Sequence, residues 1–310
     1  MLSLMTLPRV LELADPHYPK ALRRLPQPPP ILHVQGRLEL LERPGIAVVG
    51  TRCHTTYGRD ATVSIVLGLV RAGYVIVSGL ARGIDSIAHR TALDVGGDTV
   101  GVLGTGLDVP YPPEHEDLAA LMAERGCLVT EFPPGTPPLK YHFPQRNRLI
   151  AGLARAVLVV EAPEKSGALI TAHYALDEGK EIFAVPGPIH NESSRGTHRL
   201  IQDGAFLVAS AADILDVLGS RAGEPTPLPD AESAASCALG QTGLHPGASE
   251  LARRVWAALE AGAVDVEDLS GAVGASPGPL ATALLELELA GLVQKLPGPR
   301  YARAAVVPGS

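Results

Sequence analysis

FPQRNRLIAGL, residues 143–153, leads directly into the apolar run AVLVV, residues 156–160. The first segment has the spacing of a helix, and the second is a short β-branched run typical of a buried strand. The interval from Phe132 to Val160 contains no Asp or Glu, although the chain as a whole has a net charge of −7. The same interval holds four cations: Lys140, Arg146, Arg148 and Arg155.

Phe143 lies among these cations. An aromatic ring can stack on a nucleic-acid base while neighbouring cations neutralise the phosphates. The alternative interpretation is a loop whose arginines are solvated and whose Phe143 caps the core. The position of the segment within its predicted sheet favours nucleic-acid binding.

The segment belongs to a region in which strand and helix patterns alternate. Strands are predicted over 46–49, 75–77, 99–103, 127–130, 156–160 and 181–185. Helices are predicted over 60–72, 85–95, 116–125, 146–153 and 168–178. Continuous apolar strands with intervening helices indicate a parallel sheet covered on both faces. We therefore predict an α/β fold with a doubly wound, extended Rossmann-like sheet.

Turns rich in small residues follow the predicted strands at their carboxyl ends, which is where such sheets bind ligands. Small residues let a ligand approach the backbone, and the helix after each turn begins with free N–H groups suited to an anion. Arg52, Arg82 and Lys165 lie in three of these turns. Together with the segment 140–148 they predict one phosphate-rich ligand at one edge of the sheet.

A nucleotide is one candidate for that ligand. The P-loop pattern does not occur, because Lys165-Ser166 lacks the upstream glycines. The dinucleotide pattern also fails, because Gly104-Thr105-Gly106 is followed by no third glycine at the required spacing. A mononucleotide in the turn 78–83 stays open, and would make the protein a Rossmann-type enzyme such as a nucleoside-phosphate hydrolase. No nucleophile–base pair is recognisable from adjacent positions, which favours a binding protein over an enzyme.

Single-stranded nucleic acid fits the pattern better than a nucleotide or duplex DNA. A single strand offers successive phosphates to cations at several strand ends and an unstacked base to Phe143, whereas a duplex hides its base faces. A net charge of −7 and a pI of about 5.8 argue against a protein that coats duplex DNA through bulk positive charge.

The remaining composition concerns cofactors and compartment. Cys53, Cys127 and Cys237 have no C-x-x-C spacing, so we expect neither disulfides nor a zinc site, and the chain shows no cofactor motif. Pro8 and Glu12 interrupt the apolar residues at the start of the chain, which therefore lacks the pattern of a signal peptide. There is no 18-residue apolar run. We expect a cytoplasmic protein with no membrane contact.

Many ordered motifs between about residues 15 and 210 resemble the DNA-processing protein A (DprA, or Smf) family. They are Val49-Gly50-Thr51-Arg52 with Tyr57-Gly58, the runs 78–85 and 88–89, Gly97, Leu103-Gly104, Asp108, Tyr111-Pro112, and the runs 143–152, 161–162, 166–172 and 183–187. The resemblance implies a Rossmann domain that binds single-stranded DNA without catalysis. It also implies a homodimer that helps to load a RecA-type recombinase onto DNA covered by single-strand-binding protein during natural transformation, with repair as a further role.

The same resemblance implies which positions contact the DNA. Arg52 and Lys140 would hold phosphates, and Phe143 with 146–148 would form the base and backbone pocket. The turn 78–83 and the segment 165–167 would line the same edge. The predicted DNA-binding residues are Arg52, Ser78, Gly79, Arg82, Gly83, Lys140, Phe143, Arg146, Asn147, Arg148, Lys165, Ser166 and Gly167.

The domain organisation follows from shifts in composition. We predict an N-terminal lead packed on the core (1–44), the DNA-binding domain (45–218), a linker (219–247) and a winged-helix-like module (248–310) with helices over 250–261, 265–273 and 279–290. The lead is too short for the helical domain that precedes the core in many relatives. The third helix of the module contains Glu286 and Glu288 but no Lys or Arg, which favours an accessory or protein-binding role over a transcription regulator that reads duplex DNA.

Overall fold

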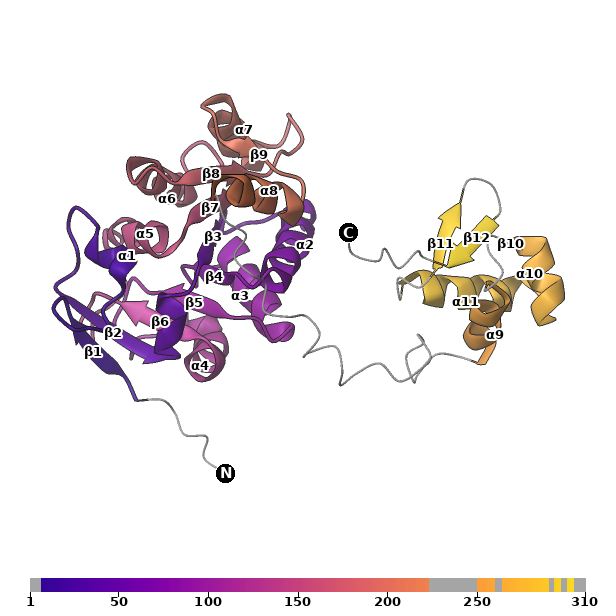
Figure 1. Cartoon of the computed structure of the whole chain (residues 1–310), viewed down its shortest axis with the longest axis horizontal. Coiled ribbons are helices and arrows are strands. Elements are labelled where there is room, and N and C mark those ends of the chain that lie inside the picture. The colour runs from indigo at the N-terminus through magenta and orange to yellow at the C-terminus, as the bar shows by residue number, and fades with distance from the viewer. Residues whose placement is uncertain (1–6, 223–249, 260–263, 290–292, 297–299, 304–310) are drawn as a thin grey trace. The chain divides into compact units, whose positions relative to one another are not determined.

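The computed structural model describes residues 7–222, 250–259, 264–289, 293–296 and 300–303 (Figure 1). The chain divides into two compact units, Met1–Leu228 and Pro229–Ser310. Helix α8 (Ala211–Ala222) includes the first residues of the predicted linker, whereas 223–247 lie outside the described residues. No helix of the described part is long and apolar enough to cross a bilayer.

One mixed sheet forms the centre of the first unit. Its strands run in the order β1-β2-β6-β5-β4-β3-β7-β8-β9. Their bounds are β1 Arg9–Glu12, β2 Ile31–Gly36, β3 Gly45–Val49, β4 Val75–Ser78, β5 Thr99–Val102, β6 Cys127–Thr130, β7 Ala156–Val159, β8 Glu181–Ala184 and β9 Phe206–Leu207.

The six strands predicted from the apolar runs, β3 to β8, are all present and are parallel to one another. The chain builds outward from β3 through β4, β5 and β6, and then returns to place β7 and β8 on the other side of β3. The strand order therefore reverses between β3 and β7. The crevice at the carboxyl ends of two such strands is where doubly wound sheets bind ligands.

The N-terminal residues extend this sheet in the opposite direction. β2 pairs antiparallel with β6, with His33 opposite Thr130, and β1 pairs antiparallel with β2. Leu32 and Val34 alternate with more exposed residues, which is the pattern of a strand with one buried face. The N-terminal residues therefore add two antiparallel strands to the β6 edge of the sheet.

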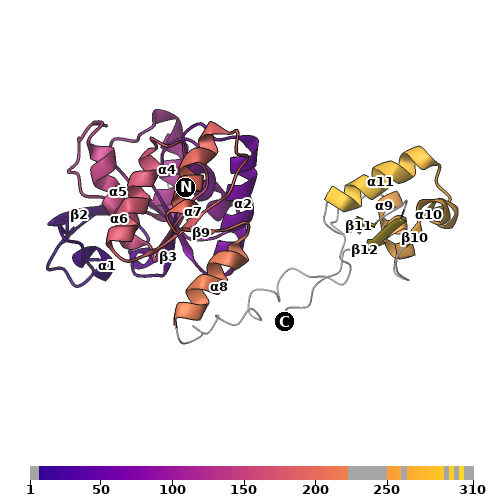
Figure 2. The ribbon, with the colours of Figure 1, turned by 90° about the horizontal axis from the view of Figure 1, so that it is seen from above.

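Helices cover both faces of the sheet. Figure 2 shows α5 and α6 on one side and α2 on the other. The bounds are α1 Lys20–Arg23, α2 Thr56–Arg71, α3 Ile84–Asp94, α4 Glu116–Arg125, α5 His142–Leu153, α6 Gly167–Asp177 and α7 Arg195–Gln202. Successive side chains of β3 point to opposite faces of the sheet, so the core has two halves. Ile46 and Val48 pack with α2, α3 and α8, whereas Ala47 and Val49 pack with α5 and α6.

The second unit has the secondary structure of a winged helix. Its elements are α9 Glu250–Ala258, β10 Val264–Asp265, α10 Val266–Val273, α11 Pro277–Leu289, β11 Val293–Leu296 and β12 Arg300–Arg303. The strands pair in the order β10-β12-β11, and side chains of the three helices share one small apolar cluster. The predicted winged-helix module is confirmed.

Candidate nucleic-acid interface

A groove of about 670 Å³ opens at the carboxyl ends of β3 and β7, the point where the strand order reverses. Its walls come from the turns after β3, β4 and β7, from α5, and from the start of α6. Of the predicted DNA-binding residues, it is lined by Arg52, Lys140, Phe143, Arg146, Asn147, Lys165, Ser166 and Gly167. Segments more than 100 residues apart in sequence thus meet at the edge that the strand topology predicted.

Three cations on this groove have no ionic partner among the described residues. Arg52, Lys140 and Lys165 are exposed, and no described carboxylate lies within ion-pair distance of any of them. Arg52 comes from the turn after β3, Lys140 from the loop before α5, and Lys165 from the turn before α6. The groove therefore presents positive charge from three directions to a ligand.

Phe143 lies between two of the groups that line the groove. The Arg52 guanidinium carbon is 5.6 Å from the centroid of the Phe143 ring, within the range of a cation–π contact. The Tyr111 ring centroid is 5.5 Å from that of Phe143 on a tilted plane. Gly104 makes room for the ring, because a Cβ at this position would be 3.0 Å from Phe143 Cδ1. The aromatic residue is held at the groove while part of it remains exposed.

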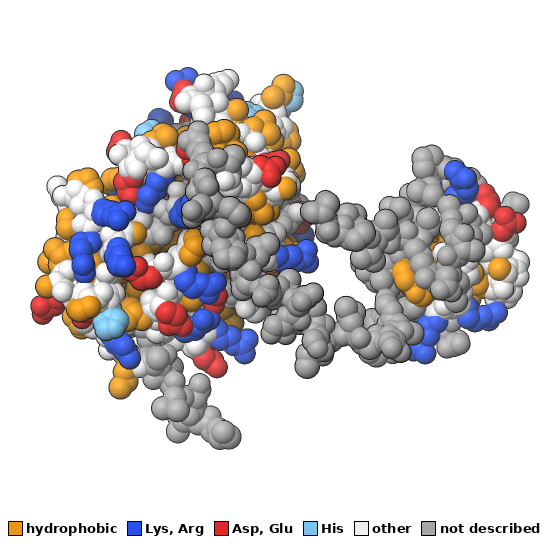
Figure 3. All heavy atoms as spheres, viewed as in Figure 1, with side chains coloured by type: hydrophobic (Ala, Val, Ile, Leu, Met, Phe, Trp, Pro, Cys, Tyr) orange, Lys and Arg blue, Asp and Glu red, His pale blue; other side chains and the backbone are white. Residues whose placement is uncertain are grey.

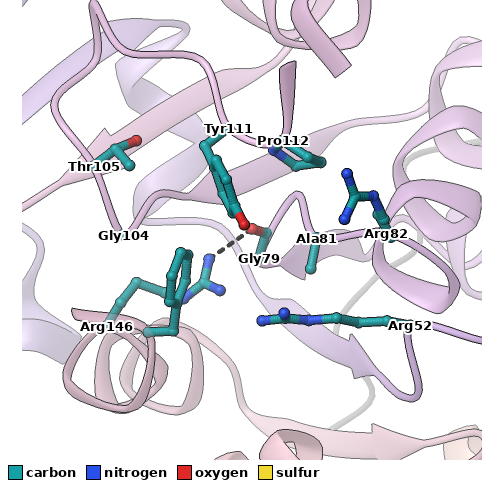
Figure 4. A pocket seen from close by; sticks show the side chains of 10 residues that line it. Arg52, Gly79, Ala81, Arg82, Gly104, Thr105, Tyr111, Pro112 and Arg146 are labelled. Carbon is teal, nitrogen blue, oxygen red and sulfur yellow. Dashed lines mark hydrogen bonds between the residues drawn. The ribbon is translucent and has the colours of Figure 1, made fainter. Parts of the chain in front are cut away.

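A smaller recess of about 20 Å³ adjoins the groove beside Tyr111, large enough for about one water molecule. Arg52, Tyr111 and Arg146 point toward one another there (Figure 4). The Arg146 Nη1 donates to the Gly79 carbonyl at 2.6 Å and also to the Val102 carbonyl. Arg146 therefore ties the ends of β4 and β5 to α5, and burial lowers the pKa of its guanidinium to about 10.

Asp85 lies beside the turn 78–83, where its buried side chain also lines the groove. Its carboxylate accepts hydrogen bonds from the Gly79 and Ala81 N–H groups at 3.1 and 3.4 Å. Burial raises the pKa of Asp85, while the charge of Arg146 and these hydrogen bonds act in the opposite direction. These two N–H groups of the turn are therefore not free for a ligand anion, because an internal carboxylate already accepts from them.

Two predicted cations are engaged in ion pairs with residues of other elements. The exposed Arg82 lines the recess, but its Nε donates to the Glu114 carboxylate before α4. Arg148 Nη2 donates to Glu131 at 2.5 Å and its Nη1 donates to the Gln27 carbonyl at 2.7 Å. Arg148 does not line the groove, because it lies on a different side of α5 from Phe143.

Three other predicted residues, Ser78, Gly83 and Asn147, hold neighbouring backbone segments together. Ser78 is fully buried and its hydroxyl donates to the Val48 carbonyl at 2.6 Å. Gly83 has a φ of +79°, and a Cβ there would be 2.3 Å from the Thr51 carbonyl oxygen, so it lets the Arg52 loop pack against the start of α3. The Asn147 amide nitrogen donates to the Gly167 carbonyl at 3.1 Å and joins α5 to α6.

Sequence reasoning did not assign Tyr111 or Thr171 to the site. Tyr111 lines both the groove and the recess, and the signal for it was its place in the loop after β5. Thr171 lines the groove with a buried hydroxyl that has no hydrogen-bond partner in the described part of the protein. Nothing in the apolar sequence around Thr171 distinguishes it from a core residue.

Known proteins are similar to this chain in sequence and fold. The family model for DNA recombination-mediator protein A matches residues 9–219, and that for the DprA winged helix domain matches residues 222–299. Protein Smf of Escherichia coli is 43% identical over 91% of this chain and 74% of its own length. The DNA processing protein DprA of Streptococcus pneumoniae is 46% identical over 66% of this chain and 72% of its own length.

Two solved structures are similar to the first unit. The crystal structure of DprA from Streptococcus pneumoniae has a TM-score of 0.65 at 45% identity, over 67% of this chain and 73% of that one. DNA processing protein A from Helicobacter pylori, whose structure describes a single-stranded DNA binding mode, has a TM-score of 0.63 at 31% identity, over 69% of this chain and 97% of that one. The chain with this parallel sheet, groove and winged helix belongs to the DNA-processing protein A (DprA/Smf) family of DNA recombination mediators.

Proposed function

We propose that this protein binds single-stranded DNA in the groove at the carboxyl ends of β3 and β7. The observation that carries the proposal is that Arg52, Lys140 and Lys165 meet the partly exposed ring of Phe143 on one groove. None of these three cations has an ionic partner in the part of the chain that the structure describes. Cations spaced along a groove match successive phosphates, and a ring held beside them can stack on a base. The structural relative from Helicobacter pylori, described with single-stranded DNA, supports the same ligand.

The residues divide into contacts and supports. Arg52, Lys140 and Lys165 would hold phosphates, and Phe143 would stack on a base. Arg146 and Asn147 of α5 would shape the groove together with the turn 78–83, since their polar atoms already bond within the protein. Ser166 and Gly167 would line the start of α6, and Arg82 would contact DNA only by releasing Glu114.

The biological role that follows is recombination mediation. A homodimer with two such grooves would hold a single strand and help a RecA-type recombinase to replace single-strand-binding protein, during natural transformation or repair. In this proposal the first unit binds DNA, and residues 248–310 are an accessory module. The side chains of the groove bind and orient DNA, and no chemical step is assigned to them.

A nucleotide-binding enzyme is less well supported than the DNA-binding protein. In the turn 78–83, the Gly79 and Ala81 N–H groups that a nucleotide phosphate would need already donate to the Asp85 carboxylate. Arg82, the cation that such an enzyme would use in the turn 78–83, is already paired with Glu114.

Binding of labelled oligothymidine by wild type, Arg52→Ala and Phe143→Ala tests the proposal. Loss of the stacked ring is expected to cost about 1–3 kcal/mol of binding free energy, or roughly 5- to 150-fold in Kd. Arg90→Ala is the matched control, because Arg90 is exposed on α3 and does not line the groove. Equal affinity of all four proteins would contradict the proposed site.

Recombinase loading is tested by adding the protein to DNA covered by single-strand-binding protein, where a shorter lag in recombinase ATP hydrolysis is expected.

A further inference from the structure

Glu161 is a carboxylate buried at the carboxyl end of β7, with only 1% of its surface exposed. It does not line the groove, and its two oxygens both point to the loop that follows β3. Oε2 accepts from the Thr55 N–H at 2.9 Å, and Oε1 accepts from the Thr55 hydroxyl at 2.6 Å. Burial of a carboxylate away from water is energetically costly unless hydrogen bonds compensate for the lost hydration, as the two bonds from Thr55 do.

The backbone of Glu161 holds the other end of the same loop. Its carbonyl accepts from the Thr51 N–H at 2.7 Å. One residue therefore fixes both Thr51 and Thr55, and Arg52 lies in the short segment between them. The Thr55 hydroxyl also accepts from the Gly58 N–H at 3.1 Å, so the contact that Glu161 makes is continuous with the start of α2.

Two glycines allow this arrangement. A Cβ at Gly58 would lie 2.1 Å from Glu161 Oε2, so only glycine leaves room for the carboxylate beside α2. A Cβ at Gly83 would lie 2.8 Å from the Arg52 Cα, so glycine also lets the loop pack closely on its other side. The backbone at Arg52 is thus confined between β7 and the turn before α3, whereas its side chain is exposed.

Glu161 also begins the loop that carries Lys165. The next residue, Ala162, donates its N–H to the Ser193 carbonyl at 2.7 Å, which fixes the start of that loop. The separation between the two cation-bearing loops is therefore set at Glu161. A loop that is already ordered loses less conformational entropy when it binds a phosphate than a mobile one.

We infer that Glu161 is a positioning residue that orders the Arg52 loop for phosphate binding and sets its spacing from Lys165. The inference rests on the proposed function, because it assumes that Arg52 contacts DNA. Glu161 makes no contact with the DNA itself. Its effect on affinity passes through Arg52 and is separable from any effect on Lys140, which lies on another loop.

The test is a double-mutant cycle read out by oligothymidine affinity. Glu161→Ala and Thr55→Val are each expected to weaken binding about 2- to 150-fold, the fold-change that corresponds to the coupling energies of residues in contact. In an Arg52→Ala background, either change should weaken binding little further. In a Lys140→Ala background, either change should weaken binding by the same factor as in the wild type. Glu161→Gln should retain most of the affinity, since its amide can accept from the Thr55 N–H and donate to the Thr55 hydroxyl.

Thr62→Val is the control for a purely structural effect. The buried Thr62 hydroxyl donates to the Gly58 carbonyl at 2.6 Å on the same helix but does not touch the Arg52 loop. Its substitution should lower the melting temperature and leave DNA affinity unchanged. Thr55→Val carries the test if Glu161→Ala does not fold.

The outcomes separate this inference from the proposed function. Equal losses in the Arg52→Ala and Lys140→Ala backgrounds, or wild-type affinity of Thr55→Val, would overturn the positioning role while the DNA site stands. Wild-type affinity of Arg52→Ala alone would remove Arg52 from the DNA site and overturn the positioning role. Wild-type affinity of Phe143→Ala as well would remove the DNA site itself.

Discussion

Lys140 and Arg148 lie on either side of Phe143 in sequence but have different surroundings. Lys140 is exposed on the groove, whereas the Arg148 side chain is 17% exposed and pairs with Glu131, whose side chain is 9% exposed. The charge of Lys140 is available to a ligand. The charge of Arg148 is used between α5, the end of β6 and the N-terminal segment.

Arg148→Ala should therefore destabilise the protein rather than weaken DNA binding. It leaves Glu131 buried without its cation, which is expected to lower the free energy of unfolding by about 1–3 kcal/mol. Urea denaturation measures this loss, and oligothymidine affinity should stay within about twofold of wild type, a change of less than 0.5 kcal/mol. The reverse pattern, with intact stability and lost affinity, would place Arg148 on the DNA as the sequence predicted.

His89 should make stability fall in acid. Its Nδ1 donates to the Thr99 hydroxyl at 2.7 Å, because that hydroxyl itself donates to the Ile76 carbonyl, and burial lowers the pKa of His89 to about 3. The unfolded chain, with a pKa near 6.5, binds a proton that the folded state excludes. The stabilisation is complete above about pH 6.5 and is lost as pH falls toward 3, at up to about 1.4 kcal/mol per pH unit.

Urea unfolding of wild type and His89→Gln between pH 7.5 and 4.5 isolates this effect from other titrating groups. Glutamine can donate to the Thr99 hydroxyl but does not titrate. The stability difference between the two proteins should change in favour of the variant by about 2–3 kcal/mol over this range. A difference that is independent of pH would show that His89 is not kept neutral by burial.

At the scale of elements, Lys180 closes the C-terminus of α5. Its Nζ donates to the Ala151 and Gly152 carbonyls at 2.7 and 2.9 Å and pairs with Glu178 at 2.8 Å. The helix that carries Phe143 is therefore fixed at its far end by the turn before β8. The last carbonyls of a helix need such partners because no following turn supplies N–H groups to donate to them.

Lys180→Met keeps the apolar stem of the side chain and removes these bonds. It should lower the free energy of unfolding by about 1–3 kcal/mol, measured by urea denaturation. Lys165→Met is the matched control, since the exposed Lys165 has no described ionic partner and its loss should change stability by less than about 0.5 kcal/mol. Equal effects of the two substitutions would contradict the capping role.

The elements that the sequence predicted correctly are those with strong apolar patterns. All six central strands come from short, mostly apolar runs, and their burial on two faces leaves little choice of structure. β1 and β9 were missed because only Leu11 is buried in β1, and β9 has only two residues. Helix α5 begins at His142 rather than at the predicted 146, since Pro144 is compatible with the first turn of a helix.

At the scale of the whole molecule, topology predicted the edge of the sheet but not the state of each cation. Arg52, Lys140 and Lys165 meet on the groove as the strand ends required. Whether a cation is free depends on partners distant in sequence. Arg148 pairs with Glu131, and Arg82 pairs with Glu114. Arg146 donates to the carbonyls of Gly79 and Val102. No local spacing in the sequence reveals these partners.

The chain binds a polyanion, in this account, through a local surface on a molecule with a net charge of −7. Other basic surfaces exist, and Lys and Arg side chains also gather over α1 and α5 on the face shown in Figure 3. A test of the site must therefore separate the groove from such surfaces. The number of counterions released from the DNA provides this separation, because each phosphate contact contributes about 0.7 to the salt dependence on a single strand.

The most direct measurement is a salt titration of oligothymidine binding by wild type and Lys140→Ala side by side. The groove predicts weaker binding by the variant and a slope of log K against log salt that is shallower by about 0.7. Superimposed curves would contradict the account and move the DNA to another surface of the protein.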